Sequence, residues 1–180
     1  MPIFKVSVED TVAINDSAES RVKKFGEVFT PPKLVNEILD KFPKTVWKAK
    51  NKTWIDPTCG DGAFLIEIKR RLLAKGHSLE HILENMLYGV DIQQDNVQKC
   101  IATLYEVDIK EVKEVSLKKL ARDYKGWKGT EGIICLFRIG DKLIKHFVCA
   151  DGLLYQYNFG EESDVQEKDK GKTTIQERLF

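Results

Sequence analysis

The residues with the clearest chemical meaning follow a short apolar stretch, Thr53-Trp54-Ile55, and form the segment Asp56-Pro57-Thr58-Cys59-Gly60-Asp61-Gly62-Ala63-Phe64. The two glycines let the backbone approach a ligand with no side chain in between, and the helix expected next points its free N–H groups at the same space. This arrangement is typical of a site for a nucleotide-like ligand. Because Asp56 and Asp61 place negative charge where a phosphate-binding loop has lysine or no charge, we expect a ligand with a cationic end.

S-adenosylmethionine is such a ligand, since its methionine end carries an ammonium group and its sulfur is positively charged. The pattern Asp56-Pro57-x-Cys59-Gly60-x-Gly62-x-Phe64 resembles the first cofactor motif of the N6-adenine (amino-group) DNA methyltransferases of restriction-modification systems. The resemblance implies S-adenosyl-L-methionine as the cofactor. It also implies that the residues of this motif contact it, namely Asp56, Cys59, Gly60, Gly62 and Phe64.

An upstream segment, Gly26-Glu27-Val28-Phe29-Thr30-Pro31-Pro32, followed by Leu34 and Val35, is similar to the part of that family that closes over the methionine end of the cofactor. Thr30 is able to cap a helix that begins with Pro31, because its hydroxyl can accept a bond from a first-turn N–H and proline fits the first turn. One apolar face of this helix is then expected: Leu34, Val35, Ile38, Leu39 and Phe42. The resemblance implies that Phe29 and Thr30 line the cofactor site and that Thr30 touches the cofactor carboxylate.

A third segment, Leu87-Tyr88-Gly89-Val90-Asp91-Ile92, is a short apolar run that ends in a carboxylate and resembles the second motif of the family. An acid at the carboxyl end of a second strand can accept both ribose hydroxyls, as in dinucleotide folds. We therefore expect Asp91 to bind the ribose, with Ile92 against the adenine face. Taken alone, Asp91 would equally well cap the helix that follows it.

The fourth segment, Phe147-Val148-Cys149-Ala150-Asp151-Gly152-Leu153, repeats the pattern of a strand followed by an acid and resembles the third motif. The resemblance implies that Asp151 accepts a hydrogen bond from the adenine amino group, with Gly152 and Leu153 beside it. Alone, Asp151-Gly152 would indicate an ordinary turn. Four segments in one order, over about residues 22 to 159, favour the cofactor interpretation.

The elements that position these residues alternate between helices and strands. Apolar periodicity and end signals predict helices over about 31–42, 63–75, 78–86 and 94–105, and Val112, Val115 and Leu120 suggest one more. Strands are expected at 53–56, 87–91, 133–139 and 143–150, with a hairpin at Gly140-Asp141 joining the last two. Right-handed crossovers between parallel strands then bring Asp56, Asp91 and Asp151 to one edge of the sheet.

The implied fold class is α/β: a truncated Rossmann-like S-adenosylmethionine-dependent methyltransferase fold that holds the cofactor-binding half of the sheet. Helices are expected on both faces, because parallel strands are apolar on both sides. We divide the chain into an N-terminal arm (1–26), the methyltransferase-like domain (27–160) and a charged flexible tail (161–180).

The catalytic loop of the family is not found. An amino methyltransferase needs Asn or Asp followed by Pro-Pro and an aromatic residue, which hold the target amine and stack on the flipped base. The one Pro-Pro pair is Pro31-Pro32, in the upstream segment. Tyr155-Gln156-Tyr157-Asn158-Phe159 is the nearest substitute by composition, but it lacks proline and follows Asp151 closely, so core or surface tyrosines are the better interpretation. No catalytic residue is assigned.

Loss of the fourth strand has a physical consequence for the strand at Trp54, since its outer side becomes an exposed edge, which folded proteins usually cover. We expect the segment Phe4 to Val8, a second copy of the chain or a partner subunit to cover it. The second and third of these alternatives correspond to a homo-oligomer and to a complex with a partner subunit.

Composition agrees with one domain, since 180 residues at 42% hydrophobic content can bury a core. The net charge of +1 gives no global basic field. DNA contact is possible through basic clusters at 21–24 and 69–71, although such clusters are more often solvated helix faces. No signal peptide and no membrane-spanning apolar run is evident, so we expect a cytoplasmic protein with no membrane partner.

The cysteines and histidines give no metal signature. Cys59, Cys100, Cys135 and Cys149 contain no Cys-x-x-Cys pair, which indicates reduced, mostly buried thiols. His77 and His81 have the helical spacing of metal ligands, but no third ligand is evident, so we expect no metal.

Three functions stay open. The first is a small adenine-N6 DNA methyltransferase, or a subunit of one, whose catalytic loop is divergent or supplied by another chain. The second is a catalytically inactive cofactor-binding module with a decoy, regulatory or anti-restriction role. The third is a methyltransferase for another substrate or a binder of another adenosine compound, although Asp56 and Asp61 would repel a dinucleotide pyrophosphate. The family resemblance favours the first, and the missing loop favours the second.

Overall fold

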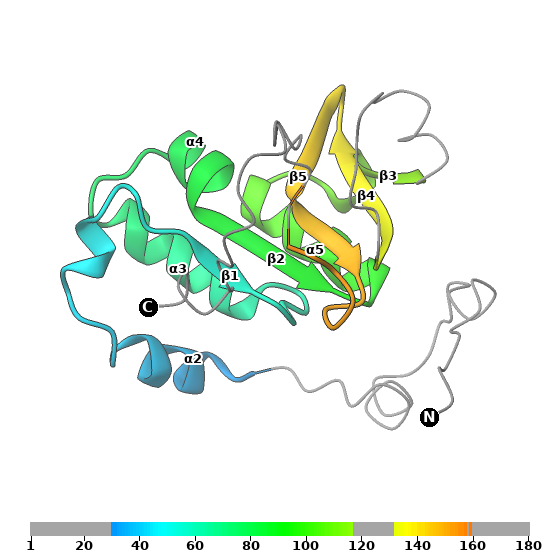
Figure 1. The fold of residues 1–180 in the computed structure, drawn as a ribbon. Coiled ribbons are helices and arrows are strands. Elements are labelled where there is room, and N and C mark those ends of the chain that lie inside the picture. The colour runs from blue at the N-terminus through cyan, green and yellow to red at the C-terminus, as the bar shows by residue number, and fades with distance from the viewer. Residues whose placement is uncertain (1–29, 117–131, 158, 160–180) are drawn as a thin grey trace, which may run out of the picture.

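The structure of the protein is a computed structural model that describes residues 30–116, 132–157 and 159. The described part is a mixed α/β fold around a five-stranded sheet of order β1-β2-β5-β4-β3 (Figure 1). The N-terminal arm expected for 1–26, the tail expected for 161–180, and Phe29 lie outside the described residues.

The sheet has a parallel half and an antiparallel half. β1 (Trp54–Asp56), β2 (Leu87–Asp91) and β5 (Lys142–Ala150) are parallel neighbours, with Trp54 opposite Leu87 and Asp91 opposite Cys149. β4 (Ile133–Ile139) runs antiparallel to β5 through the hairpin at Gly140-Asp141. The four strands predicted from the sequence and the hairpin that makes β4 antiparallel to β5 are confirmed. The expectation that residues 133–139 form the edge of the sheet is wrong, because β3 pairs with the outer side of β4.

The helices are short, and most agree with the expected ranges. They are α2 (Pro32–Leu39), α3 (Ala63–Leu73), α4 (Leu79–His81) and α5 (Gln94–Tyr105), with 3-10 turns η2 (Val46–Lys48) and η4 (Ile109–Glu111) and the π-helical turn η3 (Ile82–Met86). Gly76, with φ of +89°, follows the end of α3 as expected of a terminating glycine. Ser78 caps α4 by accepting a hydrogen bond from the amide of His81.

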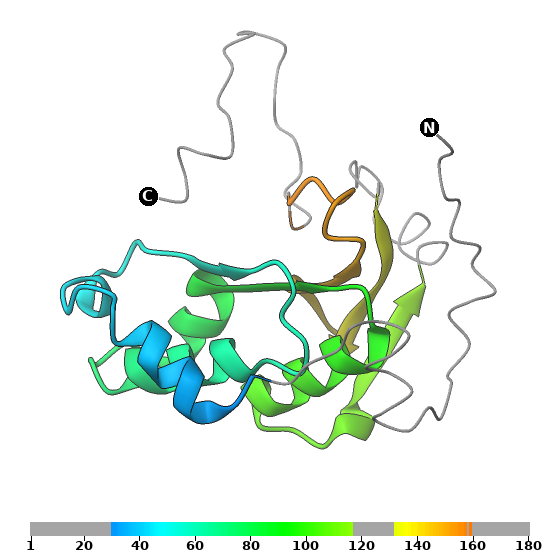
Figure 2. The same ribbon diagram turned by 90° about the horizontal axis from the view of Figure 1, so that it is seen from below.

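One face of the sheet packs against helices. Leu65 and Leu72 of α3 and Ile101 of α5 join Leu87 and Phe147 in a single buried cluster. Figure 2 shows α2, α3 and α5 on this side of the sheet.

The opposite face packs differently, which corrects the expectation of helices on both faces within the described part of the chain. Val90 of β2 and Val148 of β5 lie in a second buried cluster, together with Tyr155 and Phe159. The segment after β5 therefore provides apolar cover that a helix usually gives. Because parallel strands need apolar contacts on both faces but not a particular element, aromatic side chains in an irregular segment also suffice.

A second correction concerns residues 112–116, where the spacing of Val112 and Val115 suggests a helix. This segment is strand β3 (Val112–Ser116), antiparallel to β4 at the far edge of the sheet. Residues three apart in a strand point to opposite faces. Val112 accordingly lies in the helix-facing cluster and Val115 in the second one. Leu120, the third residue of that expected helix, lies outside the described residues.

A third correction concerns the start of α2, which begins at Pro32 with Pro31 as its N-cap and no side-chain capping bond. Thr30 is half-buried and does not cap this helix. Of the expected apolar face, Val35 and Leu39 are buried, whereas Leu34, Ile38 and Phe42 are largely exposed.

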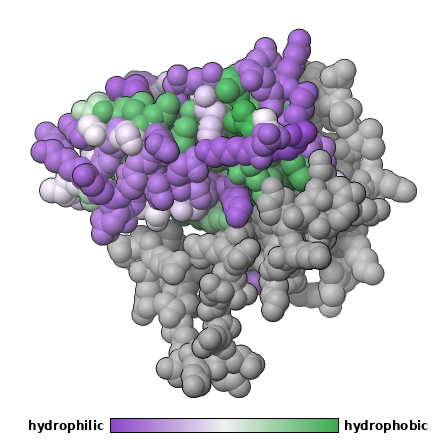
Figure 3. Space-filling model, turned by 90° about the horizontal axis from the view of Figure 1, so that it is seen from above, coloured by the Kyte–Doolittle hydropathy of each residue, from purple (hydrophilic) through white to green (hydrophobic). Residues whose placement is uncertain are grey.

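Two further features concern the surface. β1 is at the edge of the described sheet, as expected from the missing fourth strand. Figure 3 shows a band of hydrophobic residues between hydrophilic ones on the upper face. Among the described residues, no helix is long and apolar enough to cross a bilayer.

Candidate functional site

The loop between β1 and α3 is fixed by backbone hydrogen bonds. The amide of Cys59 donates to the carbonyl of Val90 in β2 (2.8 Å), and the amide of Gly62 donates to the carbonyl of Cys59 (2.9 Å). Gly60 and Gly62 have φ of +53° and +98°, the left-handed region that favours glycine. The glycine-punctuated turn expected from the sequence therefore holds a defined position over the end of β2.

The two glycines have different surroundings. A Cβ added at Gly62 would lie 2.7 Å from Sγ of Cys100, so this glycine allows α3 to pack closely against α5. A Cβ at Gly60 would meet nothing within 4 Å. Gly60 is thus the position where the backbone of the loop is open to a ligand.

Asp91 joins this loop to the end of β2. Its Oδ2 accepts from the amide of Gly60 (2.9 Å), and its Oδ1 accepts from the amide of Gln93 (2.8 Å). These bonds orient the carboxylate beside the open backbone at Gly60. Asp91 has a structural role in the turn in addition to any role in binding.

Asp56, at the carboxyl end of β1, is the second acid of the site. Its Oδ1 accepts from the amide of Thr58 (3.1 Å). Burial raises the pKa of Asp56, the hydrogen bond from the Thr58 amide partly opposes this shift, and the negative charge of Asp91 adds a smaller increase. Two carboxylates therefore share one partly desolvated edge, an arrangement that favours a cationic group.

The segment after β5 completes this edge. Oδ1 of Asp151 accepts from the amide of Leu153 (2.9 Å), and the carbonyl of Asp151 accepts from the amide of Tyr155 (2.8 Å), which makes a tight turn. A Cβ added at Gly152 would lie 3.0 Å from the carbonyl oxygen of Pro57. The fourth segment thus touches the loop between β1 and α3. The structure brings Asp56, Asp91 and Asp151 to the carboxyl ends of neighbouring strands.

The remaining predicted residues differ in exposure. Cys59 is buried, and hydrogen bonding to the Cys100 thiol, followed by burial, raises the pKa of its thiol. Phe64 packs partly buried against the helix-facing cluster. Ile92 and Leu153 are 47% and 95% exposed, so both side chains are available for contact.

The amino end of α2, where Thr30 precedes the helix, lies beside the loop between β1 and α3 in both Figures 1 and 2. Of the two residues predicted for the methionine end of the cofactor, Phe29 falls outside the described residues and Thr30 comes two residues before α2. No side-chain bond of Thr30 caps α2.

Two residues of the site were missed from the sequence. Cys100 meets Gly62 from α5, and Tyr157 donates its hydroxyl hydrogen to the carbonyl of Gly152 (2.7 Å). Tyr157 also has φ of +55°, an uncommon backbone conformation for an aromatic residue. Neither belongs to a motif. The one sequence feature that includes Tyr157 is the group of aromatic residues from 155 to 159, and it does not by itself indicate a role in the site.

That aromatic run is mainly core, as the sequence interpretation preferred. Tyr155 and Phe159 are buried on the second face of the sheet, and the amide of Phe159 donates to the hydroxyl of Tyr155 (2.7 Å). Tyr155 therefore cannot stack on a flipped base without leaving the core. Within the described ranges, no Asn or Asp is followed by Pro-Pro and an aromatic residue.

The cysteines and histidines have structural surroundings. All four cysteines are buried free thiols, as predicted. Nε2 of His77 bonds the carbonyl of Trp47 (2.8 Å), and Nε2 of His81 bonds the carbonyl of Lys50 (2.9 Å). Among the described residues, no group of three His, Cys, Asp or Glu side chains could hold a metal ion.

Comparison with known proteins identifies a family. The family model described as N-6 DNA Methylase matches residues 11–128, which contain the loop at 56–64 and the strand that ends at Asp91. The segment at Asp151 lies beyond the match. Neither the curated proteins nor the solved structures contain a match to this chain. Because the family model covers more than half of the sequence, the chain belongs to the N-6 DNA methylase family.

Proposed function

We propose that the chain binds S-adenosyl-L-methionine at the carboxyl ends of β1, β2 and β5, as the cofactor-binding part of an adenine-N6 DNA methyltransferase linked to restriction-modification. The observation that carries this proposal is the meeting of Asp56, Asp91 and the Asp151-Gly152 turn around the open backbone of Gly60. These residues lie at the ends of three neighbouring strands. The four sequence segments also follow one another along the chain in the order of the family motifs that they resemble.

The residues present fit this cofactor. The open space at Gly60 allows a ligand to approach the backbone, and the charge of Asp56 and Asp91 suits the ammonium and sulfonium groups. Asp91 stands at the end of β2, where a carboxylate can accept from ribose hydroxyls. When bound, S-adenosyl-L-methionine supplies an electrophilic methyl group.

The other predicted residues take positions around the same ligand. Asp151 would accept from the adenine amino group, with the exposed side chains of Ile92 and Leu153 beside the base. Thr30, Phe29 and the side chains of Cys59 and Phe64 would complete the methionine end and the floor of the site. Gly62 acts indirectly, through the packing of α3 against α5.

An inactive cofactor-binding module is the second candidate, and a specific observation favours it. Tyr155 and Phe159, aromatic residues shortly after the fourth segment, are buried in the second cluster of the core. Methyl transfer would then need an Asn or Asp and an aromatic residue from another segment to orient the target amine.

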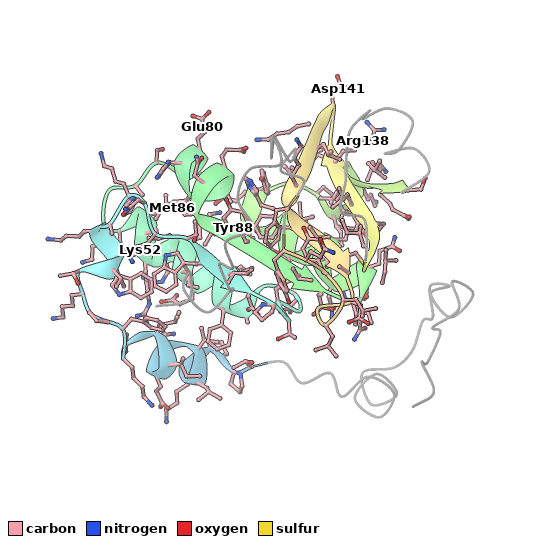
Figure 4. The ribbon with its side chains drawn as sticks, in the orientation of Figure 1. Lys52, Glu80, Met86, Tyr88, Arg138 and Asp141 are labelled. Atoms are coloured by element: carbon pink, nitrogen blue, oxygen red, sulfur yellow. The ribbon has the colours of Figure 1, made fainter. Side chains whose placement is uncertain are left out.

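Calorimetric titration with S-adenosyl-L-methionine tests the proposal. Asp91→Ala removes the carboxylate, and we expect affinity to fall about 10- to 100-fold, since bonds to charged groups contribute about 1.5–3 kcal/mol. Asp141→Asn, at the distant hairpin (Figure 4), is the matched control and should bind as the wild type does. No binding to the wild type would reject both candidates.

A labelled-methyl transfer assay on unmethylated DNA then separates the two candidates. Binding with transfer indicates the methyltransferase. Binding without transfer indicates the inactive module.

A further inference from the structure

An exposed basic segment connects α2 to β1. Its lysines are all exposed and lie within residues 41–52: Lys41, Lys44, Lys48, Lys50 and Lys52. No acidic residue occurs between Lys41 and Ile55. We call residues 41–52 the lysine segment.

Several other cationic side chains of the described residues are paired. Lys69 donates to Glu106 and to the carbonyl of Leu104, both at 2.7 Å, and Arg70 and Arg71 both bond Glu67. The cluster at 69–71 noted in the sequence is therefore engaged within the fold. In contrast, no lysine of the lysine segment makes an ion pair with any carboxylate of the described residues. This local positive charge is not neutralised there.

Contacts with side chains of the fold hold the backbone of the lysine segment in place. Trp47 is buried, stacks on Trp54 with ring centroids 4.6 Å apart, and has the guanidinium of Arg71 5.2 Å from its ring. His77 and His81 each hydrogen-bond a carbonyl of the segment through Nε2. Because a carbonyl only accepts, Nε2 carries the proton in both rings. The lysines therefore project from a fixed backbone, which reduces the entropy cost of binding.

A regular array of negative charges is the partner that suits such a surface. Duplex DNA carries about one negative charge per 1.7 Å of helix axis. Lys52 lies at the amino end of β1 (Figure 4), and the four residues from there to Asp56 span about 13 Å of extended chain. A duplex held at the candidate site could therefore reach the lysine segment with a flanking stretch of its backbone.

We propose that the lysine segment, at the amino end of β1, binds the phosphate backbone of duplex DNA without reading its sequence, while the cofactor site lies at the carboxyl end of the same strand. The proposal rests on the proposed function for the choice of DNA as the partner. An anionic membrane surface would use the same lysines. DNA is favoured because β1 joins the lysine segment directly to the candidate site of a DNA methylase family member.

Fluorescence anisotropy of a labelled duplex over a range of salt concentrations tests this proposal. We expect wild-type binding with a Kd of about 10⁻⁴ to 10⁻⁶ M, typical of non-specific binding. Lys48→Gln/Lys52→Gln should reduce the slope of log K against log salt by up to about 1.8, since each neutralised phosphate contributes about 0.9. Affinity at 0.1 M salt should fall roughly tenfold for each lysine–phosphate pair that the substitutions remove.

The control variant is Lys110→Gln/Lys113→Gln, which removes the same charge from exposed positions on η4 and β3. It should keep the wild-type slope. Equal decreases in both variants would show a net-charge effect and overturn the proposal. So would wild-type binding to vesicles of phosphatidylserine and phosphatidylcholine with none to DNA.

Calorimetry with S-adenosyl-L-methionine on the same variants separates this proposal from the proposed function. Both variants should bind the cofactor as the wild type does. If the wild type fails to bind the cofactor but the slope still depends on Lys48 and Lys52, the proposed function fails and the DNA surface stands. If the cofactor binds and the slope does not change, the DNA surface fails alone.

Discussion

The charge of Asp56 destabilises the folded state, as is common for ionisable side chains at functional sites. Its pKa in the folded state lies above the usual 3.8, chiefly because of burial. The folded state therefore binds more protons than the unfolded state between the two pKa values, and stability falls as pH rises through that window. Above the window the loss is constant, so the charge of Asp56 destabilises the fold at neutral pH.

We therefore expect Asp56→Asn to raise the melting temperature at about pH 7 and to leave it nearly unchanged at about pH 3, where Asp56 is protonated. The asparagine oxygen can still accept from the Thr58 amide, so the turn is kept. Thermal denaturation at both pH values measures the difference. An equal shift at both would contradict the electrostatic explanation. The same variant should bind S-adenosyl-L-methionine more weakly.

The backbone conformations of Gly60 and Gly62 lead to a second prediction about single residues. Both have positive φ, so alanine at either position should cost about 1–2 kcal/mol of unfolding free energy. Gly62→Ala should cost more, because its Cβ would also meet Sγ of Cys100. Urea denaturation measures both, and Gly62→Ala/Cys100→Ala should recover the additional loss. Equal losses for the two single variants would contradict the packing role of Gly62.

The two glycines also show which features of the site can be predicted from the sequence. The sequence motifs predict the loop and the three acidic residues, because glycine and aspartate at the ends of strands can be recognised from the neighbouring sequence alone. It does not separate the ligand-facing Gly60 from the packing Gly62. That difference comes from Cys100, on another helix. Tyr157 is unpredictable for a similar reason, since its bond to Gly152 depends on how the chain turns after β5.

At the scale of elements, prediction succeeded where the pattern was local and failed where distant segments decide the outcome. α5 and β2 were predicted with their observed bounds. For β3, the valine spacing was ambiguous, and pairing with β4 determined the strand. The cover of the second sheet face was also unpredictable. It depends on residues 155–159 folding back over Val90 and Val148.

That cover predicts a graded loss of stability at Tyr155. Tyr155→Ala should lower the unfolding free energy by about 3–5 kcal/mol, the range for removing a buried aromatic ring. Tyr155→Phe keeps the ring but leaves the Phe159 amide without its acceptor, and should cost about 1–3 kcal/mol. Urea denaturation with unchanged m-values measures both. If both variants were as stable as the wild type, as expected for an exposed side chain, the assignment of this segment to the core would be wrong.

At the scale of the whole molecule, the outer side of β1 is one of the two edges of the described sheet, and β3 forms the other. Within the described ranges β2 is the pairing neighbour of β1, on one side only. Ile55 in this strand is 37% exposed, and Phe42 lies beside Trp54 with ring centroids 5.4 Å apart. An apolar strand edge of this kind readily pairs with another extended segment. The expectation from the sequence that a second chain covers it stays a prediction.

Ile55→Lys tests that prediction, because a lysine on an edge strand opposes pairing with another chain. We expect the wild type to form dimers or larger species in light scattering, and Ile55→Lys to shift them toward monomer. Ile109→Lys is the matched control, since Ile109 is 40% exposed but lies on η4, away from β1. It should keep the wild-type mass. A monomeric wild type at all concentrations, or the same change in both variants, would show that association through β1 does not occur.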